Sequence, residues 1–446
     1  MDKKLRFETL QIHAGYTPDQ TKALVAPIHL TTTYAFDDAE HAADLFNLDF
    51  KDGKSPFIYA RLNNPTTSIF EQRMAALEGG IAAVATASGH AAQMVVVMNL
   101  LRSGDNLVVS PYIYGGTNTQ FFVAFKDLGI EARKAASDKA EDLEKLIDEN
   151  TKLLYVENIA NPYFSIPDFE ELAVLAKKYD IPLVVDNTFG CGGYLCQPLK
   201  FGANIVIESA TKWIGGHASV MGGVVVDGGT FNWANGKFPK LSEPSAGYHG
   251  IRFTEKFGAG AFAMRCVAEI LRDMGATISP FNSWMMLRGL ETLSVRVDRE
   301  CENAMKIAQW LQNHPAIYDV NYLGLENNPY HALAKKYLRN GFGSVMTFRV
   351  KGGLEKAKQF VEALKLASHV TNIGDVRTLI THPASTTHRQ MSETAQTAAG
   401  VYPDMLRLSI GLEHIEDIKD DLQQALSLKA PQYSDISLPK AQINAK

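Results

Sequence analysis

The residues most able to do chemistry lie in the stretch 205–217, an apolar run that ends in two hydroxyls, a lysine, an indole and a glycine pair. Lys212 directly follows this run, beside Ser209 and Thr211, whose hydroxyls could hold an anion. An amine in that setting can become nucleophilic through partial desolvation, which is the chemistry of a Schiff-base lysine. Taken alone, such a lysine is more often a solvated strand end. The assignment of Lys212 as a Schiff-base lysine therefore needs support from other residues.

Asp186 gives part of this support, because it directly follows a second apolar run at 181–185. An aspartate at the end of a buried strand is commonly a loop residue or a helix cap. With Lys212 one strand later, Asp186 becomes the expected carboxylate partner of a pyridinium nitrogen. The pair is more specific than either residue alone.

The elements that must position these groups follow from the hydrophobic pattern. Apolar strands are predicted at 82–86, 106–109, 153–156, 183–185, 205–207 and 221–226, alternating with helices at about 66–78, 90–101, 117–128, 139–148 and 169–179. This alternation predicts an α/β fold with a mostly parallel sheet covered on both faces. Ligands of such sheets bind at the carboxyl ends of the strands. We therefore expect one crevice to be lined by Ser88, Tyr114, Glu157, Asp186 and Lys212.

A tight turn at Ser88, Gly89 and His90 joins the first strand to the next helix. Such a turn presents free backbone N–H groups to an anion. The glycine could equally be present only because the turn needs backbone angles that other residues rarely adopt. A histidine at this position is more often a packed or capping residue than a catalytic one.

The whole chain divides into three parts. Residues 1–65 show little periodicity and are interpreted as an extended arm, residues 66–277 as the large domain, and residues 278–446 as a smaller α+β domain. A stretch at about 228–257 is rich in Gly, Pro and aromatic residues, and its length is typical of a lid, an oligomer contact or a surface feature.

Arg407 stands inside an apolar strand at 405–410, where an arginine is costly unless it is paired. A structural ion pair would explain it. A bidentate clamp for a substrate carboxylate would explain it equally well.

Composition limits the classes of function. The 446 residues are 46% hydrophobic and carry a formal net charge of -5. A net negative charge does not favour binding to the phosphate backbone of nucleic acid. Four cysteines in so long a chain make neither a disulfide framework nor a zinc motif, and a reducing setting fits best. Neither a signal peptide nor a bilayer-spanning run is found, so we expect a soluble, cytoplasmic protein without metal or membrane partners.

Several motifs in one order carry a family resemblance. They are Tyr59-Ala-Arg61, Ser88-Gly89, Tyr114-Gly-Gly-Thr117, Val185-Asp186-Asn187-Thr188, Ser209-Ala-Thr211-Lys212 and Arg407-Leu-Ser-Ile-Gly-Leu-Glu413. Over nearly its whole length the chain resembles the pyridoxal-phosphate-dependent transsulfuration family. The resemblance implies fold type I of the pyridoxal-phosphate enzymes, with pyridoxal 5'-phosphate as cofactor.

The resemblance also implies roles for individual residues. Lys212 would bind the cofactor as a Schiff base and move protons, Asp186 would pair with the pyridine nitrogen, and Tyr114 would stack on the ring. The implied cofactor contacts further include Ser88, Gly89, His90, Asn161, Ser209 and Thr211, joined by Tyr59 and Arg61 from a neighbouring subunit. Tyr59 would also act in catalysis with Lys212 and Tyr114. Arg407, helped by Asn372, would bind the substrate carboxylate.

Features shared with one subgroup of the family stand at 157–162, 248–250, 372–375 and 382–388. They imply a γ-replacement in methionine biosynthesis, in which O-acetyl-L-homoserine and sulfide give L-homocysteine and acetate. Family members are typically homotetramers with shared active sites, and a sulfur-carrier protein is a possible further partner.

Other activities on the same scaffold remain open, namely cystathionine γ-synthase, O-succinylhomoserine sulfhydrylase and methionine γ-lyase. Gly116 stands where methionine γ-lyases carry cysteine, which weakens that option. Ala87 and the segment Asn158-Ile-Ala160 depart from the commoner serine and Ser-Pro-Thr. A nucleotide-binding protein on an open α/β sheet has little support, because neither a G-x-G-x-x-G nor a phosphate-loop motif occurs in the expected places.

Overall fold

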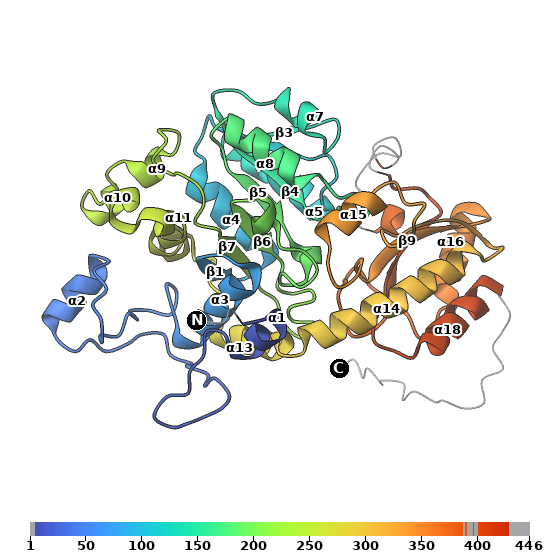
Figure 1. The fold of residues 1–446 in the computed structure, drawn as a ribbon, viewed down its shortest axis with the longest axis horizontal. Helices are drawn as coiled ribbons and strands as arrows, with labels where there is room; N and C mark the ends of the chain where they lie inside the picture. Colours follow the sequence, from blue (N-terminus) through green and yellow to red (C-terminus); the bar gives the residue numbers. More distant parts are fainter. Residues whose placement is uncertain (1–4, 387–388, 390–395, 397–399, 428–446) are drawn as a thin grey trace, which may run out of the picture.

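The computed structural model describes residues 5–386, 389, 396 and 400–427. Thr387 and His388 of the subgroup segment, residues 1–4 of the predicted arm and residues 428–446 of the predicted C-terminal domain lie outside the described residues. The described chain forms two sheets that lie side by side along the longest axis of the molecule (Figure 1).

The larger sheet has seven strands in the order β1-β7-β6-β5-β4-β2-β3. Its strands are β1 (Ala82–Thr86), β2 (Asn106–Val109), β3 (Glu131–Lys134), β4 (Thr151–Glu157), β5 (Leu183–Asp186), β6 (Ile205–Glu208) and β7 (Gly223–Asp227). Only β7 runs antiparallel to its neighbours, so the predicted mostly parallel sheet is confirmed. The edge strand β3 was not predicted, because its sequence Glu-Ala-Arg-Lys lacks an apolar run.

Helices cover both faces of this sheet, and each face has its own hydrophobic core. Consecutive strand residues alternate between the two cores, as Leu154 and Val156 face one and Leu153 and Tyr155 the other. The first core is packed by α3 (Pro65–Glu78), α8 (Phe169–Lys178) and α13 (Pro280–Leu290), and the second by α4 (Gly89–Leu100) and α11 (Ala261–Arg265). Double coverage explains why most of these strands are continuous apolar runs.

Several helices differ in extent from the sequence-based expectation. Residues 115–127 form one helical run, α5 (Gly115–Thr119), a π-helical stretch at Gln120–Ala124 and α6 (Phe125–Asp127). A similar run combines α11, a π-helical stretch at Cys266–Leu271 and α12 (Arg272–Met274). The expected helix at 139–148 is wrong in length, since α7 covers only Ala140–Glu144. The amphipathic region after residue 280 is divided into α13 and α14 (Leu293–Gln312).

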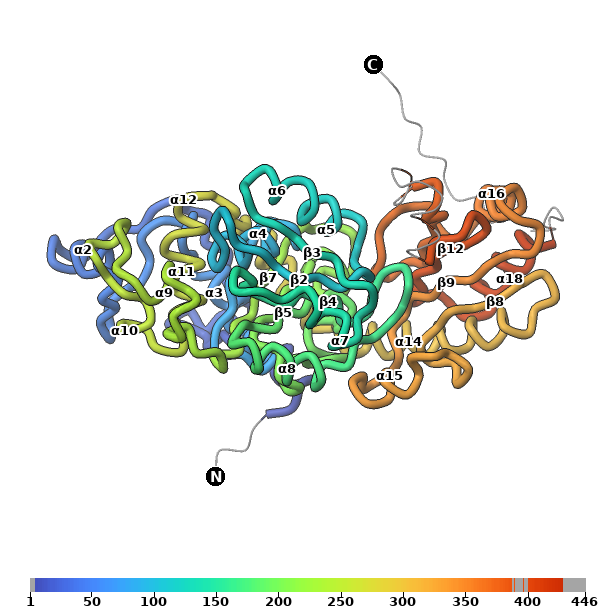
Figure 2. The backbone as a smooth tube through the Cα atoms, turned by 90° about the horizontal axis from the view of Figure 1, so that it is seen from above, coloured from blue at the N-terminus to red at the C-terminus, as the bar shows by residue number. Residues whose placement is uncertain are grey.

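The smaller sheet has the order β10-β11-β12-β9-β8. Its strands are β8 (Ile317–Asn321), β9 (Val345–Val350), β10 (Ser368–His369), β11 (Leu379–Thr381) and β12 (Met405–Ser409). Helices α14, α16 (Gly353–Ala363) and α18 (Ile415–Ser427) pack on it around a third core, and α15 (His331–Tyr337) lies between the sheets. This is the predicted combination of a large α/β part with a smaller α+β part. Figure 2 shows the small sheet at the end opposite to α2.

The interpretation of residues 1–65 as an extended arm is wrong in part, because two helices form within it. Helix α1 (Phe7–His13) packs on α3, and Gln11 from α1 donates a 2.9 Å hydrogen bond to Ser294 of α14. Helix α2 (Ala39–Phe46) is capped by the preceding Asp38, whose side chain accepts from the His41 N–H. Its short amphipathic pattern is interrupted by polar residues, so it gave little periodicity to read.

The stretch at 228–257 is not a loose loop. It contains α9 (Pro239–Ser242) and α10 (Phe253–Phe257), and its aromatic residues Trp233, Phe238 and Phe253 are buried in the core shared with α4 and α11. Within the described residues, no helix is both long and apolar enough to cross a membrane.

Candidate active site

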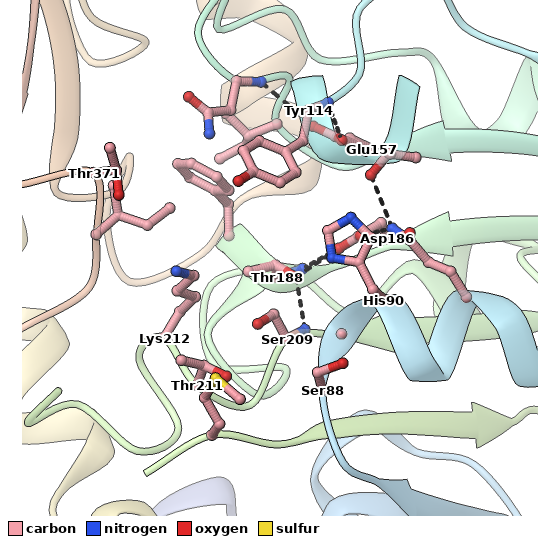
Figure 3. Close-up of a pocket in the computed structure, with 18 of the residues that line it drawn as sticks. Ser88, His90, Tyr114, Glu157, Asp186, Thr188, Ser209, Thr211, Lys212 and Thr371 are labelled. Atoms are coloured by element: carbon pink, nitrogen blue, oxygen red, sulfur yellow. Dashed lines mark hydrogen bonds between the residues drawn. The ribbon is translucent and has the colours of Figure 1, made fainter. Parts of the chain in front are cut away.

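A cavity of about 210 Å³ opens at the carboxyl ends of the large-sheet strands and is closed on the other side by the small sheet (Figure 3). The structure brings all five expected side chains together there, Ser88, Tyr114, Glu157, Asp186 and Lys212. Gly89, His90, Asn161, Ser209, Thr211 and Arg407 line the same cavity. The strand-end argument therefore predicted correctly that these side chains share one cavity.

Asp186 ends β5 and accepts four hydrogen bonds. Its Oδ1 accepts from the Thr188 hydroxyl at 2.6 Å and from the Thr188 N–H at 3.0 Å. Its Oδ2 accepts from the Tyr155 hydroxyl at 3.1 Å and from the Gln93 side-chain amide at 3.2 Å. Burial raises the pKa of Asp186, and these hydrogen bonds oppose that rise. The carboxyl group is thus fixed in orientation beside the cavity, where it can meet a protonated ring nitrogen.

Lys212 extends into the cavity from the turn after β6 (Figure 3). Its Nζ donates a 2.7 Å hydrogen bond to Asn372 Oδ1. Burial, and then the nearby Arg407 guanidinium, lower the pKa of Lys212 to about 8. Near neutral pH a useful fraction of this amine is therefore unprotonated and nucleophilic.

An anion cradle lies at the start of α4. Ser88 caps this helix by accepting a 3.1 Å hydrogen bond from the Ala91 N–H. The first N–H groups of a helix have no partner within the helix, which leaves those of Gly89 and His90 for an anion. A Cβ on Gly89 would lie 2.8 Å from Ser209 Cβ, so only glycine permits this approach.

The hydroxyls on the far side of the cradle are tied to the sheet. Thr211 Oγ1 exchanges 3.2 Å hydrogen bonds with the backbone of Gly222. The Ser209 N–H donates at 2.9 Å to Thr188 Oγ1, the hydroxyl that also donates to Asp186. The ends of β5 and β6 are thereby held together.

Tyr114 is anchored through its backbone by Glu157. The Tyr114 N–H donates a 2.6 Å hydrogen bond to Glu157 Oε1, and Glu157 lies opposite Asp186 in the register of β4 and β5. Burial and the adjacent Asp186 raise the pKa of Glu157. Gly116 leaves room for the Tyr114 ring, because a Cβ there would lie 2.7 Å from that ring and 2.7 Å from the His90 imidazole.

Arg407 lies on β12 and is buried. Its guanidinium donates to Asn161 Oδ1 at 3.2 Å and to the Thr371 carbonyl at 2.8 Å, and burial lowers its pKa to about 10. Among the described residues no carboxylate forms an ion pair with it. The structural ion pair that the sequence left open is therefore not found there, and the guanidinium retains its charge for an anion in the cavity.

Tyr59 and Arg61 do not line the cavity of their own chain. Both are exposed, and the Arg61 guanidinium lies over the Tyr59 ring, 5.2 Å from its centroid. Their contribution from a neighbouring subunit stays a prediction.

Sequence reasoning missed several lining residues, among them Gln93, Thr117, Ile159, Phe189, Met221, Thr371 and Ile373. Gln93 could have been found, because it stands four residues after Gly89 on the same helical face. For Thr371 and Ile373 hydrophobic periodicity gave no signal, because they lie between two short strands. The family resemblance did single out the segment at 372–375, which contains Ile373 and follows Thr371.

These residues fit pyridoxal phosphate. The anion cradle, which a side chain at Gly89 would fill, matches the phosphate. The buried carboxyl group of Asp186 matches the ring nitrogen, and the Lys212 amine with its lowered pKa matches the aldehyde. Fold and site together define a pyridoxal-phosphate-dependent enzyme of fold type I.

Comparison with known proteins narrows this class. The chain belongs to the Cys/Met metabolism PLP-dependent enzyme family, which matches residues 8–427. The O-acetyl-L-homoserine sulfhydrylase 1 of Thermus thermophilus is 50% identical, over 95% of this chain and 100% of that protein. The homocysteine synthase of Schizosaccharomyces pombe is 48% identical, over 95% and 98%.

A solved structure is similar over the same extent. It is a putative O-acetylhomoserine (thiol)-lyase from Campylobacter jejuni, whose crystal structure contains a pyridoxyl-lysine monophosphate. It superposes with a TM-score of 0.91 at 38% identity and covers 95% of this chain and 100% of that one.

Proposed function

We propose that this enzyme converts O-acetyl-L-homoserine and sulfide to L-homocysteine and acetate. The observation that carries the proposal is the placement of the Lys212 amine in one cavity with Asp186 and with Arg407, a buried cation that no described carboxylate neutralises. The names of relatives at 45–50% identity support this choice of substrate.

Pyridoxal phosphate, when bound, supplies an aromatic ring that accepts the electron pair left on the substrate when a proton is removed. Asp186 would accept a hydrogen bond from the protonated ring nitrogen. Ser209, Thr211 and the N–H groups of Gly89 and His90 would bind the phosphate, and Tyr114 would stack on the ring. Asn161 would lie near the ring hydroxyl.

Lys212 would move the protons. Acetate leaves from Cγ, two carbons from Cα, so one proton must leave Cα and a second must leave Cβ before the acetate can depart. A single amine on a flexible side chain can serve both positions in turn, because it becomes a base again once it has passed the first proton on. The lowered pKa of Lys212 provides its neutral form near the pH at which the enzyme works.

Arg407 would bind the substrate carboxylate through two N–H groups, with Asn372 beside it. Its hydrogen bonds to Asn161 and Thr371 leave the guanidinium plane fixed before substrate arrives. A fixed carboxylate directs the rest of the substrate toward the Lys212 amine.

The same proposal includes a cytoplasmic homotetramer with shared sites. Exposed Tyr59 and Arg61, together with exposed apolar residues of the N-terminal segment such as Leu24 and Leu30, support contacts between subunits. Tyr59 would then assist catalysis in a neighbouring site. Four buried, unpaired cysteines suit a reducing compartment. Sulfide could arrive free or on a sulfur-carrier protein.

The test is to follow the visible absorbance of the purified protein while adding O-acetylhomoserine and then sulfide, and to measure homocysteine and acetate. We expect the ester to change the spectrum and homocysteine to appear only after sulfide. Lys212→Ala should abolish both responses. O-succinylhomoserine, cysteine and methionine, added in parallel, test the related activities. A spectrum that the acetyl ester leaves unchanged would overturn the substrate assignment.

A further inference from the structure

Two glutamates with no place in the proposed reaction lie buried beneath the cavity. Glu78 is the last residue of α3 and Glu208 is the last residue of β6. Their exposed fractions are 0% and 1%. A carboxyl group so deeply buried needs a hydrogen-bond partner for each oxygen or a proton of its own.

One oxygen of each group has such a partner. Glu78 Oε1 accepts from the Asn187 side-chain amide at 2.8 Å, and Glu208 Oε2 accepts from the Gly192 N–H at 2.9 Å. Asn187 Nδ2 also donates to the Cys196 carbonyl at 2.9 Å. Both N–H groups of this amide are therefore used, which fixes the orientation of the Asn187 side chain.

The second oxygen of each group, Glu78 Oε2 and Glu208 Oε1, is buried and receives no hydrogen bond from another described residue. The two carboxyl groups nevertheless contact adjacent residues, because Glu208 Oε2 accepts from Gly192 at 2.9 Å and a Cβ on Gly193 would lie 3.2 Å from Glu78 Cδ. At these positions the two carboxyl groups interact directly with each other. Two ionised carboxylates in direct contact would repel each other strongly in an apolar interior. One proton held between them removes the repulsion and satisfies both remaining oxygens.

The surroundings provide little alternative compensation. The positive charge of Arg339 lowers the pKa of Glu78. Its guanidinium, however, donates its hydrogen bonds to the carbonyls of Gly193 and Tyr194. The other titratable neighbours of the pair are Cys191, Cys196 and Asp186, none of which brings a positive charge. Burial raises the pKa of both Glu78 and Glu208.

We propose that Glu78 and Glu208 share a single proton and that this pair is a positioning device for the cofactor site. The shared proton joins the end of α3 to the ends of β5 and β6. Asn187, which Glu78 holds, follows Asp186 directly, and Glu208 precedes Ser209. The proposal rests on the cofactor site and is independent of the substrate.

Glutamine substitutions give this arrangement a distinctive signature. In Glu208→Gln the amide oxygen can still accept from Gly192, and its NH₂ can donate to Glu78 without any shared proton. Glu78→Gln works in the same way with Asn187. In the double variant both amide oxygens are needed by Asn187 and Gly192, so two NH₂ groups face each other. Rotating either amide only moves the donor–donor contact to Asn187 or Gly192.

The experiment compares the full-length holoenzyme with Glu78→Gln, Glu208→Gln and the double variant. We expect each single variant to melt at about the same temperature as the parent. Its affinity for pyridoxal phosphate should stay within about threefold of the parent's. The double variant should melt below both and bind the cofactor at least about tenfold more weakly. Additive effects, with a double variant no worse than the sum of the singles, would overturn the proposal.

A second measurement needs no double variant. Buried carboxyls outside the pair, Glu71, Glu157 and Glu300, also have raised pKa values and contribute protonated C=O stretches at neutral pH. The infrared difference spectrum between the parent and each single glutamine variant should therefore show the loss of one such stretch, that of the shared proton. The pH dependence of stability must agree. The native pair keeps a proton that free glutamates lose above a pKa of about 4.3, so this contribution to stability falls as pH rises above that value. Either single substitution should flatten that decline, and an unchanged decline or an unchanged infrared band would count against the shared proton.

Discussion

Lys212 Nζ and Asn372 Oδ1 are joined by a 2.7 Å hydrogen bond that connects the turn after β6 to the segment between β10 and β11. Through this contact the small sheet helps to hold an amine that the large sheet presents. The amide oxygen accepts a hydrogen bond without adding charge. The contact therefore orients the amine and leaves its lowered pKa in place.

The pKa of Lys212 can be followed in the cofactor-free protein, because only the neutral amine captures pyridoxal phosphate. We expect the capture rate to rise with pH through about 8. Arg407→Met should move this rise to higher pH, because removing a neighbouring positive charge makes protonation of Lys212 easier. Stopped-flow absorbance measures the rate. Lys237→Met, which changes a lysine outside the cavity, serves as the control and should leave the profile in place.

Arg407 is expected to govern substrate binding. Arg407→Lys keeps the positive charge but loses the planar pair of donors, so the KM for O-acetylhomoserine should rise by about tenfold to a hundredfold while kcat falls less. Steady-state kinetics separate the two constants.

Thermal unfolding of Arg407→Met distinguishes this role from a structural one. Because no described carboxylate pairs with Arg407, its loss leaves no buried charge without a partner, and the melting temperature should change little. A large fall in melting temperature with an unchanged KM in the lysine variant would indicate a structural role instead.

The sequence was informative wherever one local pattern determined the structure. Alternating apolar runs predicted the strands β1, β2, β4, β5 and β6 to within about two residues, and the carboxyl-end rule placed Lys212 and Asp186 in one cavity. Edge strand β3 and the two-residue β10 were missed because their residues are exposed or half-buried, which leaves little hydrophobic pattern.

Contacts between distant segments were the part that local patterns could not provide. Two of the four hydrogen bonds of Asp186 come from residues 31 and 93 positions away, and Glu78 interacts with Glu208 across 130 positions of the chain. No spacing in the chain encodes such pairs. That no described carboxylate pairs with Arg407 likewise became visible only in the packed structure, and its role as a substrate clamp stays a prediction.

Tyr155 is expected to support Asp186 from beneath the cavity. Tyr155→Phe removes the 3.1 Å hydrogen bond that Asp186 Oδ2 accepts and that helps to lower the pKa of Asp186, so this pKa should rise. The ion pair that we propose between Asp186 and the ring nitrogen should then weaken. We expect kcat to fall by about tenfold, the size of one lost hydrogen bond to a charged group. Tyr179→Phe removes a hydroxyl that bonds to Glu144 on the surface and should leave kcat unchanged. Equal kinetics for the two variants would refute the supporting role.

Gly116 is expected to be required for the position of the Tyr114 ring. A Cβ at residue 116 would lie 2.7 Å from Tyr114 Cε1 and 2.7 Å from His90 Nε2, closer than carbon atoms approach in proteins. Gly116→Ala should therefore displace the ring over the cofactor site and reduce kcat/KM by about tenfold or more, with a changed absorbance or fluorescence of the bound cofactor. Gly260→Ala is the matched control, because a Cβ there meets no atom within 4 Å. If Gly116→Ala retained full activity and an unchanged cofactor spectrum, the Tyr114 ring would not need the space that this glycine leaves.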